Sequence, residues 1–349
     1  MPSPFPASTS KAGHGIVHLT LIGSTPTFTT LTYSYPLKLL PSVSHKLPSK
    51  LKDASTSELN GSSQPAALPS TCPLLFLLNY GGGLLAGDTI SITLTLDPGT
   101  RICCTTQGMT RVYAPAASSI LSHPPSSQIL HATVGAGAAL WLAPDPVQPF
   151  AGSYYAQFQT FEVADGGSVG FVDWFTEGRT ARGEKWDLAS WRGRNDVFAV
   201  SSTDSANAER KRLLVRDAIM LEQPGLRARM DNMGIMGTLV LRGPLFESLG
   251  KFFVDEFALM PRIGGRNWET SEASGDLKKL NTRDDWRQQR QEAEKNGQVL
   301  WSACHVRGCT IVKFMAPALQ PAKDWLVNML REERTVTKEF GPCGGWFER

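Results

Sequence analysis

The chain carries little charge for its length, and this limits the kinds of partner it can have. Asp, Glu, Lys and Arg make up 19% of its 349 residues, whereas roughly a quarter is usual in globular chains. Much of the surface must therefore be uncharged, which is typical of faces that partner proteins cover. The net charge is only +3, so no nucleic-acid partner is expected. We interpret the short run Glu209–Arg212 as a solvated turn.

Long apolar runs are also missing. No stretch approaches the roughly 20 apolar residues that a membrane-spanning helix needs. Met1–His14 is rich in Pro and Ser but has neither the basic start nor the apolar middle of a secretory signal. We therefore expect a disordered N-terminus over residues 1–15, no membrane partner and a cytoplasmic location.

Clustered metal ligands are absent from the sequence. The adjacent Cys103 and Cys104 should point to opposite faces of a strand, and the spacing of all six cysteines fits no thiolate cluster. We expect reduced thiols. The six histidines are scattered, without a His-x-His or His-Glu-x-x-His motif. No tightly bound cofactor is therefore expected.

The glycine-rich segment Gly81–Thr89 lacks what a nucleotide site requires. A phosphate-binding loop needs a lysine where this chain has Asp88, and a carboxylate there would repel phosphates. A dinucleotide fingerprint must open a helix, but an alternating strand pattern follows here. The segment is predicted to be a turn between strands, with Asp88 beside a flexible backbone.

What the sequence does contain is a strand pattern with a weak repeat. Apolar residues alternate with Ser and Thr from Ile90 to Leu96, which indicates a half-buried strand. An apolar-x-x-Gly-x-x-apolar pattern then occurs three times, at 96–102, 134–140 and 163–169. Each copy predicts a strand, a tight turn at the glycine and a second strand. Stacked, β-helix-like layers and a run of ordinary hairpins both fit this pattern.

Helical spacing of apolar residues appears only late in the chain. Leu245–Phe257 and Trp325–Leu330 are predicted helices, and Arg283–Asn296 has a weaker helical pattern with little apolar face. The predicted fold is mainly β, with stacked β-helix-like or multi-sheet strand layers and two or three α-helices, mostly in the C-terminal third. We expect one domain over 16–349 with flexible insertions at about 41–70 and 262–298.

Polar residues gather directly after the repeated strands. Thr105 and Thr106 follow the first copy, and Asp145 follows the second between two prolines. Glu177 and Glu184 follow the third. If the copies stack, these side chains share one edge of the molecule, and the acids line one path together with Asp88.

Each of these residues also has a purely structural interpretation. Asp145 between its prolines is suited to fixing a turn, and Thr105 and Thr106 fit a plain strand. Glu177 and Glu184 are suited to pairing with Arg179 and Arg182.

Four of these segments together resemble the urease accessory protein D family. They are Gly82–Asp88, Thr105–Gln107, Pro144–Pro146 with Phe150, and Gly178–Glu184, and their order and approximate spacing also match. The resemblance covers roughly Ile16–Phe253 and fades in the two insertions and the C-terminal portion.

The resemblance implies a mainly β accessory protein rather than an enzyme. It implies binding to urease accessory protein F, recruitment of the GTPase accessory protein G, and docking on apo-urease to support nickel insertion. A water-filled passage for nickel is proposed in the family. Carried over by position, Asp88, Asp145 and Glu184 are the candidates for transient nickel contact, with Thr105, Thr106 and Glu177 as possible neighbours.

Three hypotheses follow. The first is a nickel-delivery chaperone, for which partly hydrated carboxylates suit an ion that must enter and leave. The second is a scaffold that positions partners while nickel travels elsewhere. The third is a β-helix-type glycosidase or lyase with paired acids such as Asp173 and Glu177, which requires a defined carboxyl separation.

Overall fold

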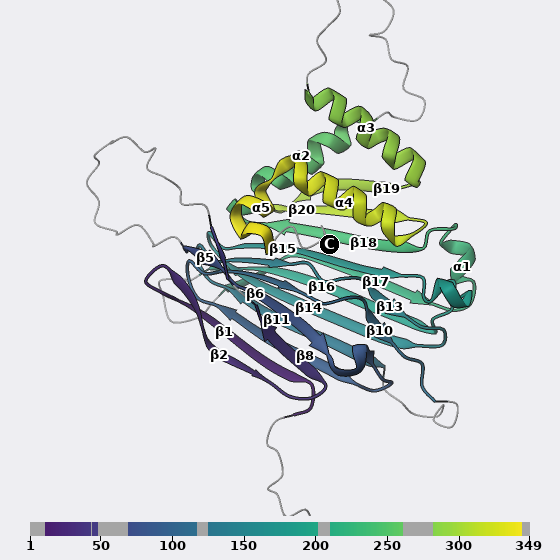
Figure 1. Ribbon diagram of the computed structural model, residues 1–349, viewed down its shortest axis with the longest axis horizontal. Helices are drawn as coiled ribbons and strands as arrows, with labels where there is room; N and C mark the ends of the chain where they lie inside the picture. The colour runs from purple at the N-terminus through teal and green to yellow at the C-terminus, as the bar shows by residue number, and fades with distance from the viewer. Residues whose placement is uncertain are drawn as a thin grey trace, which may run out of the picture.

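The computed structural model describes residues 11–42, 44–47, 69–116, 125–201, 210–260 and 282–343. The described residues form a mainly β structure with two large stacked sheets and α-helices gathered at one end (Figure 1). This confirms the predicted fold class. In the described part of the chain, no helix combines the length and apolar composition that crossing a bilayer requires.

The first sheet has seven strands among the described residues. In spatial order they are β17 (Arg210–Glu222), β16 (Ser190–Ser201), β14 (Tyr154–Ala164), β11 (Ser126–Val134), β8 (Thr89–Leu96), β1 (His14–Ile22) and β2 (Thr25–Tyr33). The five strands from β16 to β1 run parallel to their neighbours, and the outermost pairs β16–β17 and β1–β2 are antiparallel.

The second sheet has eleven described strands. Its main path is β19 (Leu300–Val306), β20 (Cys309–Ala316), β18 (Ile235–Arg242), β15 (Ser168–Thr176), β12 (Ala139–Leu142), β9 (Arg101–Thr105), β6 (Leu74–Asn79) and β3 (Leu37–Pro41). The short strands β7 (Gly83–Leu84), β10 (Thr110–Val112) and β13 (Val147–Pro149) join beside this path, while β4 (His45–Lys46) and β5 (Thr71–Cys72) pair separately.

The chain alternates between the two sheets, as in a β-helix. It passes from β8 to β9, from β11 to β12 and from β14 to β15, and each passage turns at the glycine of one repeat copy. Gly99, Gly137 and Gly166 have φ values of 76°, 67° and 75°, a region that residues with a Cβ resist. The repeat therefore marks the corners of stacked layers, and the hairpin alternative is wrong.

The corner residues are aligned by the strand register. Val134 pairs with Leu96 on one side and Val163 on the other, and Leu140 pairs with Ile102 and Val169 in the second sheet. All of these side chains are buried between the sheets, so the repeated apolar positions form the core. As predicted, Cys103 and Cys104 face opposite sides of β9, because each belongs to a different apolar cluster.

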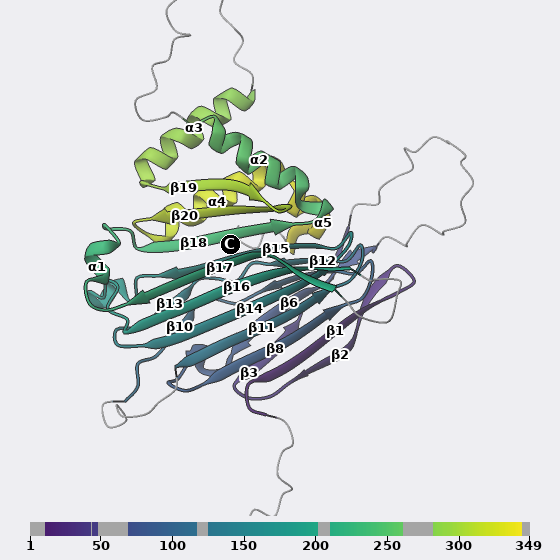
Figure 2. The ribbon, with the colours of Figure 1, turned by 180° about the vertical axis from the view of Figure 1, so that it is seen from behind.

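Helices cover the end of the second sheet that β18, β19 and β20 form (Figures 1 and 2). They are α2 (Glu247–Ala258), α3 (Thr282–Gly297), α4 (Leu319–Glu333) and α5 (Thr335–Phe340), while the short α1 (Leu226–Arg229) lies apart from them. Both predicted late helices are present as α2 and α4. The 3-10 turn Pro244–Phe246 leads into α2, as the proline indicated.

Part of the second expected insertion is a packed helix. Within 262–298, residues 282–297 form α3, and Arg290 is only 1% exposed. It pairs with Glu294 at 2.6 Å and with Glu256 of α2 at 3.3 Å. Ion pairs and an aromatic contact, between Trp286 and Phe252, attach α3 to α2, so apolar periodicity gave only a weak signal. Residues 1–10 of the expected N-terminal tail, 48–68 of the first insertion and 262–281 of the second lie outside the described residues.

Replacing Gly137 by Ala should destabilise the protein by about 1 kcal/mol, because the corner needs a positive φ that alanine adopts at a cost. Gly137→Asn should lose less, since asparagine tolerates this region better. Guanidinium-induced unfolding measures both. Equal losses for Ala and Asn would show that the backbone angle is not what the corner requires.

Candidate functional site

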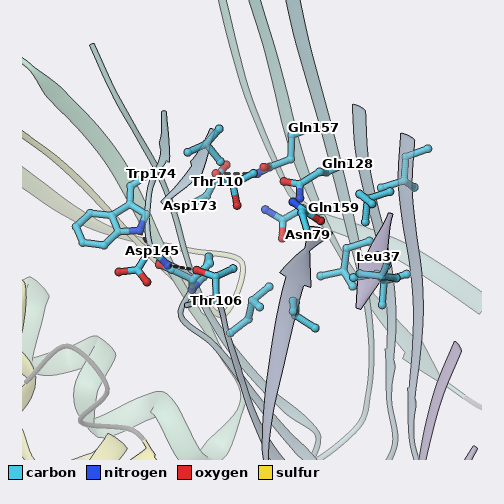
Figure 3. Close-up of a pocket in the computed structure, with 18 residues that line it drawn as sticks. Leu37, Asn79, Thr106, Thr110, Gln128, Asp145, Gln157, Gln159, Asp173 and Trp174 are labelled. Atoms are coloured by element: carbon cyan, nitrogen blue, oxygen red, sulfur yellow. Dashed lines mark hydrogen bonds between the residues drawn. The ribbon is translucent and has the colours of Figure 1, made fainter. Parts of the chain in front are cut away.

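A cavity of about 80 Å³ lies between the two sheets, close to the segments that follow the repeated strands (Figure 3). One water needs roughly 10–15 Å³ of such a volume, so the cavity has room for several waters. Its polar lining consists of Asn79, Thr106, Thr110, Gln128, Asp145, Gln157, Gln159 and Asp173. Polar groups from both sheets thus meet inside an otherwise apolar interior.

The segments that follow the repeats do lie side by side, as stacking predicted. β10 pairs in parallel with β13, where Thr110 lies opposite Val147, and β13 pairs with β15, where Val147 lies opposite Phe175. The loops that contain Thr106 and Asp145 lead into β10 and β13 at this edge. The strand register therefore brings these two residues to one mouth of the cavity.

Asp145 and Thr106 are joined by a direct hydrogen bond. The backbone N–H of Asp145 donates to Thr106 Oγ1 at 2.8 Å, and Asp145 Oδ2 accepts from the Gly108 N–H at 2.8 Å. Burial raises the pKa of the Asp145 carboxyl, although the Gly108 N–H, the Lys323 charge and Thr106 oppose the shift. Asp145 therefore bridges two loops and lines the cavity with a carboxyl whose charged form is disfavoured.

A second carboxyl, Asp173 of β15, is held by amides deeper in the cavity. Its two oxygens accept from Gln157 Nε2 at 2.8 Å and Asn195 Nδ2 at 2.6 Å. Burial nevertheless raises its pKa. The Tyr155 hydroxyl lies 2.5 Å from Gln128 Oε1 and 2.9 Å from Gln157 Oε1. These contacts form a hydrogen-bonded row from β11 through β14 to β15, of which Figure 3 shows the bond between Gln157 and Asp173.

The other expected site residues lie in different local settings. Asp88 Oδ2 accepts from the Leu85 N–H at 2.9 Å and closes the glycine-rich turn. Thr105 is fully buried and donates to the Ala143 carbonyl at 2.8 Å. Neither residue lines the cavity.

Glu184 pairs with Arg179, as its structural interpretation proposed. It accepts from the Arg179 N–H at 2.9 Å and from Arg179 Nε at 2.8 Å. Burial alone would raise the pKa of Glu184, but the bonds and charge from Arg179 outweigh it and lower this pKa. The Arg179 guanidinium also stacks on the Phe150 ring, 3.9 Å from its centre. The pair fixes the shape of the loop 178–184 without entering the cavity.

Glu177 is buried beside the backbone of Gly234 and also lies outside the cavity lining. Burial raises its pKa, partly offset by the charges of Lys185 and Arg227. The acid pair Asp173 and Glu177, considered for sugar cleavage, therefore does not share the cavity. Of the four acids expected to line one path, which are Asp88, Asp145, Glu177 and Glu184, Asp145 alone lines the cavity.

Sequence reasoning missed the glutamines. Tyr155, Gln157, Gln159, Phe161 and Val163 alternate along β14 and form its inward face. Two glutamines at core-facing positions of a strand were the available signal, because buried amides require partners. Across the described residues, no group of three or more His, Cys, Asp or Glu side chains converges in a way that could hold a metal ion.

Comparison with known proteins gives a consistent result. A family model described as UreD urease accessory protein matches residues 17–342. The chain is similar to urease accessory protein D of Arabidopsis thaliana, with 31% identity over 240 residues that cover 68% of this chain and 70% of that protein. It is also similar to an uncharacterized urease accessory protein ureD-like of Schizosaccharomyces pombe, with 29% identity over 266 residues covering 74% and 81%. Urease accessory protein UreD of an Anaeromyxobacter strain is 33% identical over 190 residues, covering 54% and 60%.

The raised pKa of Asp145 predicts a distinctive pH dependence. A carboxyl with a raised folded-state pKa contributes stability fully below the unfolded pKa of about 3.9, and this contribution is lost as pH rises through the folded pKa. Asp145→Asn removes the titration. The free energy of unfolding of the wild type, relative to this variant, should therefore fall as pH rises through that window in guanidinium unfolding.

Asp97 provides a control of opposite sign. Hydrogen bonding from Thr20 is the largest influence on this carboxyl and, together with His18, lowers its pKa. Relative to Asp97→Asn, the wild type should thus gain stability as pH rises. Parallel pH profiles for the wild type and Asp145→Asn would contradict a raised Asp145 pKa.

Proposed function

The chain belongs to the UreD urease accessory protein family, and from this premise we propose that it assists the maturation of urease together with other urease components. Urease accessory protein D of Arabidopsis and the other relatives carry this role in their names. A family of accessory proteins points to a non-catalytic role. Both oxygens of Asp173 accept hydrogen bonds from side-chain amides, and Glu177 lies outside the cavity. This arrangement favours an accessory role over a sugar-cleaving enzyme.

We propose more specifically that nickel reaches apo-urease through the cavity between the sheets. The observation that carries this proposal is a cavity with room for several waters, lined by two carboxyls, Asp145 and Asp173, and by amide and hydroxyl oxygens. Oxygen ligands hold nickel less tightly than imidazoles or thiolates do, so the ion can be admitted and released. A metal ion favours the deprotonated carboxyl, and burial raises the pKa of both carboxyls, so protons compete with nickel here more strongly than at an exposed carboxylate.

The expected acids then divide into two roles. Asp145, at the loop edge of the cavity, contacts nickel, with Thr106 beside it. Asp88 and Glu184 shape the loops around that edge through their bonds to Leu85 and Arg179. In this proposal they influence nickel passage by positioning backbone rather than by coordinating the ion.

The partners in this proposal are urease accessory protein F, the GTPase accessory protein G and apo-urease. Nickel is cargo rather than a resident cofactor. The competing function is a scaffold that only brings these partners together. The two functions differ in whether a change to the cavity lining alters nickel loading while partner binding is retained.

Asp145→Ala should lower the nickel content and the activity of urease matured in a defined activation assay with purified partners. The reason is that the variant removes a carboxylate from the cavity lining. Affinity for accessory proteins F and G should not change. Nickel bound per urease, measured by elemental analysis, together with co-elution of the partners, checks both expectations.

Asp165→Ala is the matched control, because it removes the same charge from an exposed turn between β14 and β15. It should mature urease like the wild type. Full nickel loading with Asp145→Ala would support the scaffold, whereas loss of partner binding would mean that the variant had altered the surface.

A further inference from the structure

The outer face of the first sheet is open. The strands from β17 to β2 present this face in Figure 2, and no helix of the described residues crosses it. Parallel strands are usually covered on both faces, yet five parallel strands lie here with one face towards solvent. A surface of this kind suggests a partner that completes the covering.

One end of this face, formed by β14, β16 and β17, has the composition of a protein interface. Tyr154 is 48% exposed and Met220 is 66% exposed. Arg192, Arg194 and Arg216 are 59%, 45% and 49% exposed. Tyr, Met and Arg are the residue types enriched in protein–protein contacts, and Tyr and Arg are frequent energetic hot spots.

The register places these side chains next to one another. Arg192 pairs across β16 and β17 with Met220, and Arg194 lies opposite Phe158 of β14. The Arg194 guanidinium is 5.5 Å from the centre of the Phe158 ring. We refer to Tyr154, Phe158, Arg192, Arg194, Arg216 and Met220 as the arginine face.

A buried acid holds part of the arginine face in place. The side chain of Asp196 is 3% exposed and accepts from Arg216 Nε at 2.8 Å and Arg216 Nη2 at 2.9 Å. Arg194 Nε lies 3.3 Å from the same carboxylate. The buried Asp196 carboxylate fixes these guanidinium groups before binding, which lowers the entropy lost when a partner docks. The remaining N–H groups of each guanidinium are suited to outside carboxylates.

The exposed charge of this face is mainly positive. Asp196 and Glu162 lie beneath the basic side chains, at 3% and 12% exposure, and Glu222 is the more exposed acid, at 51%. The exposed run from Arg210 to Arg212 extends the basic character along β17 rather than forming the turn that the sequence suggested. A partner with surface carboxylates is therefore complementary.

A protein fits the arginine face better than a nucleic acid does. The exposed side chains of Met220 and Tyr154 add apolar contact area to this face. Contacts to the phosphate backbone of a nucleic acid come from charged and polar groups, so such a partner would leave this apolar area unused. We propose that the arginine face is a docking surface for an acidic, carboxylate-bearing surface of a partner protein. The identity of that protein rests on the proposed function, which limits it to the urease components.

The test uses the whole chain and two purified probes, apo-urease and accessory protein F, with Kd measured by biolayer interferometry. The double variant Arg192→Glu/Met220→Asp should bind one of the two probes on the order of tenfold to a hundredfold more weakly. Binding of the wild type to that probe should also weaken as salt rises. Both positions are exposed, and Asp196 with its partners is left intact.

Tyr154→Ala provides a second variant without a change of charge, and it should weaken the same interaction. The control Lys251→Glu/Arg307→Glu reverses two exposed charges outside the first sheet, on α2 and on the β19–β20 turn. It should bind both probes like the wild type.

Several results would overturn the docking surface. They are unchanged affinity of the double variant for both probes, an equal loss in the control, and binding of a 20-base DNA duplex but of neither protein. Self-association that the double variant abolishes, without any effect on the probes, would assign the face to a second copy instead. A wild-type chain that fails to support urease maturation would refute the proposed function, whereas full probe binding by a maturation-competent double variant would refute only the docking surface.

Discussion

The register between parallel strands is the constraint on which the rest of the structure depends. Leu96, Val134 and Val163 are aligned across three strands of the first sheet, and the glycine three residues later turns each strand into the second sheet. A shift by one residue would turn every core side chain of a strand outwards. The same alignment brings the loops ending at Thr106 and Asp145 together, although 39 residues separate these two in the chain.

The cavity is a consequence of polar residues at inward positions of this layered core. Gln157 and Gln159 occupy inward positions of β14 in line with Phe161 and Val163, which lie further along the same strand. A buried amide without a partner costs about 1–3 kcal/mol, so these positions tolerate glutamine only with neighbours such as Asp173 and with water. The Asn195 Oδ1 atom, buried beside Asp173, has no hydrogen-bond partner among the described residues.

The fold could be predicted from the sequence further than the site could. Corner glycines, alternating apolar residues and helical apolar spacing are local signals. They predicted the turns at the corners, the half-buried strand Ile90–Leu96 and the helices α2 and α4, but they left stacked layers and hairpins open. The packing of α3 was weakly signalled because its attachment is largely ionic, through Arg290 and Glu256. Which residue of a strand faces the cavity depends on the register between neighbouring strands, and this register cannot be read from a single sequence.

The acids show that a repeat predicts which strands stack more reliably than it predicts where the carboxylates in the following loops point. Asp88, Asp145 and Glu184 all follow strands that stack, but each carboxylate is oriented by its nearest N–H donors. Asp88 turns to Leu85 and Glu184 turns to Arg179, both within five residues along the chain. Asp145, flanked by prolines that lack an N–H, instead reaches Gly108 across the loops. The hydrogen bond from the Gly108 N–H thus ties Asp145 to the loop of the neighbouring layer, beside the cavity.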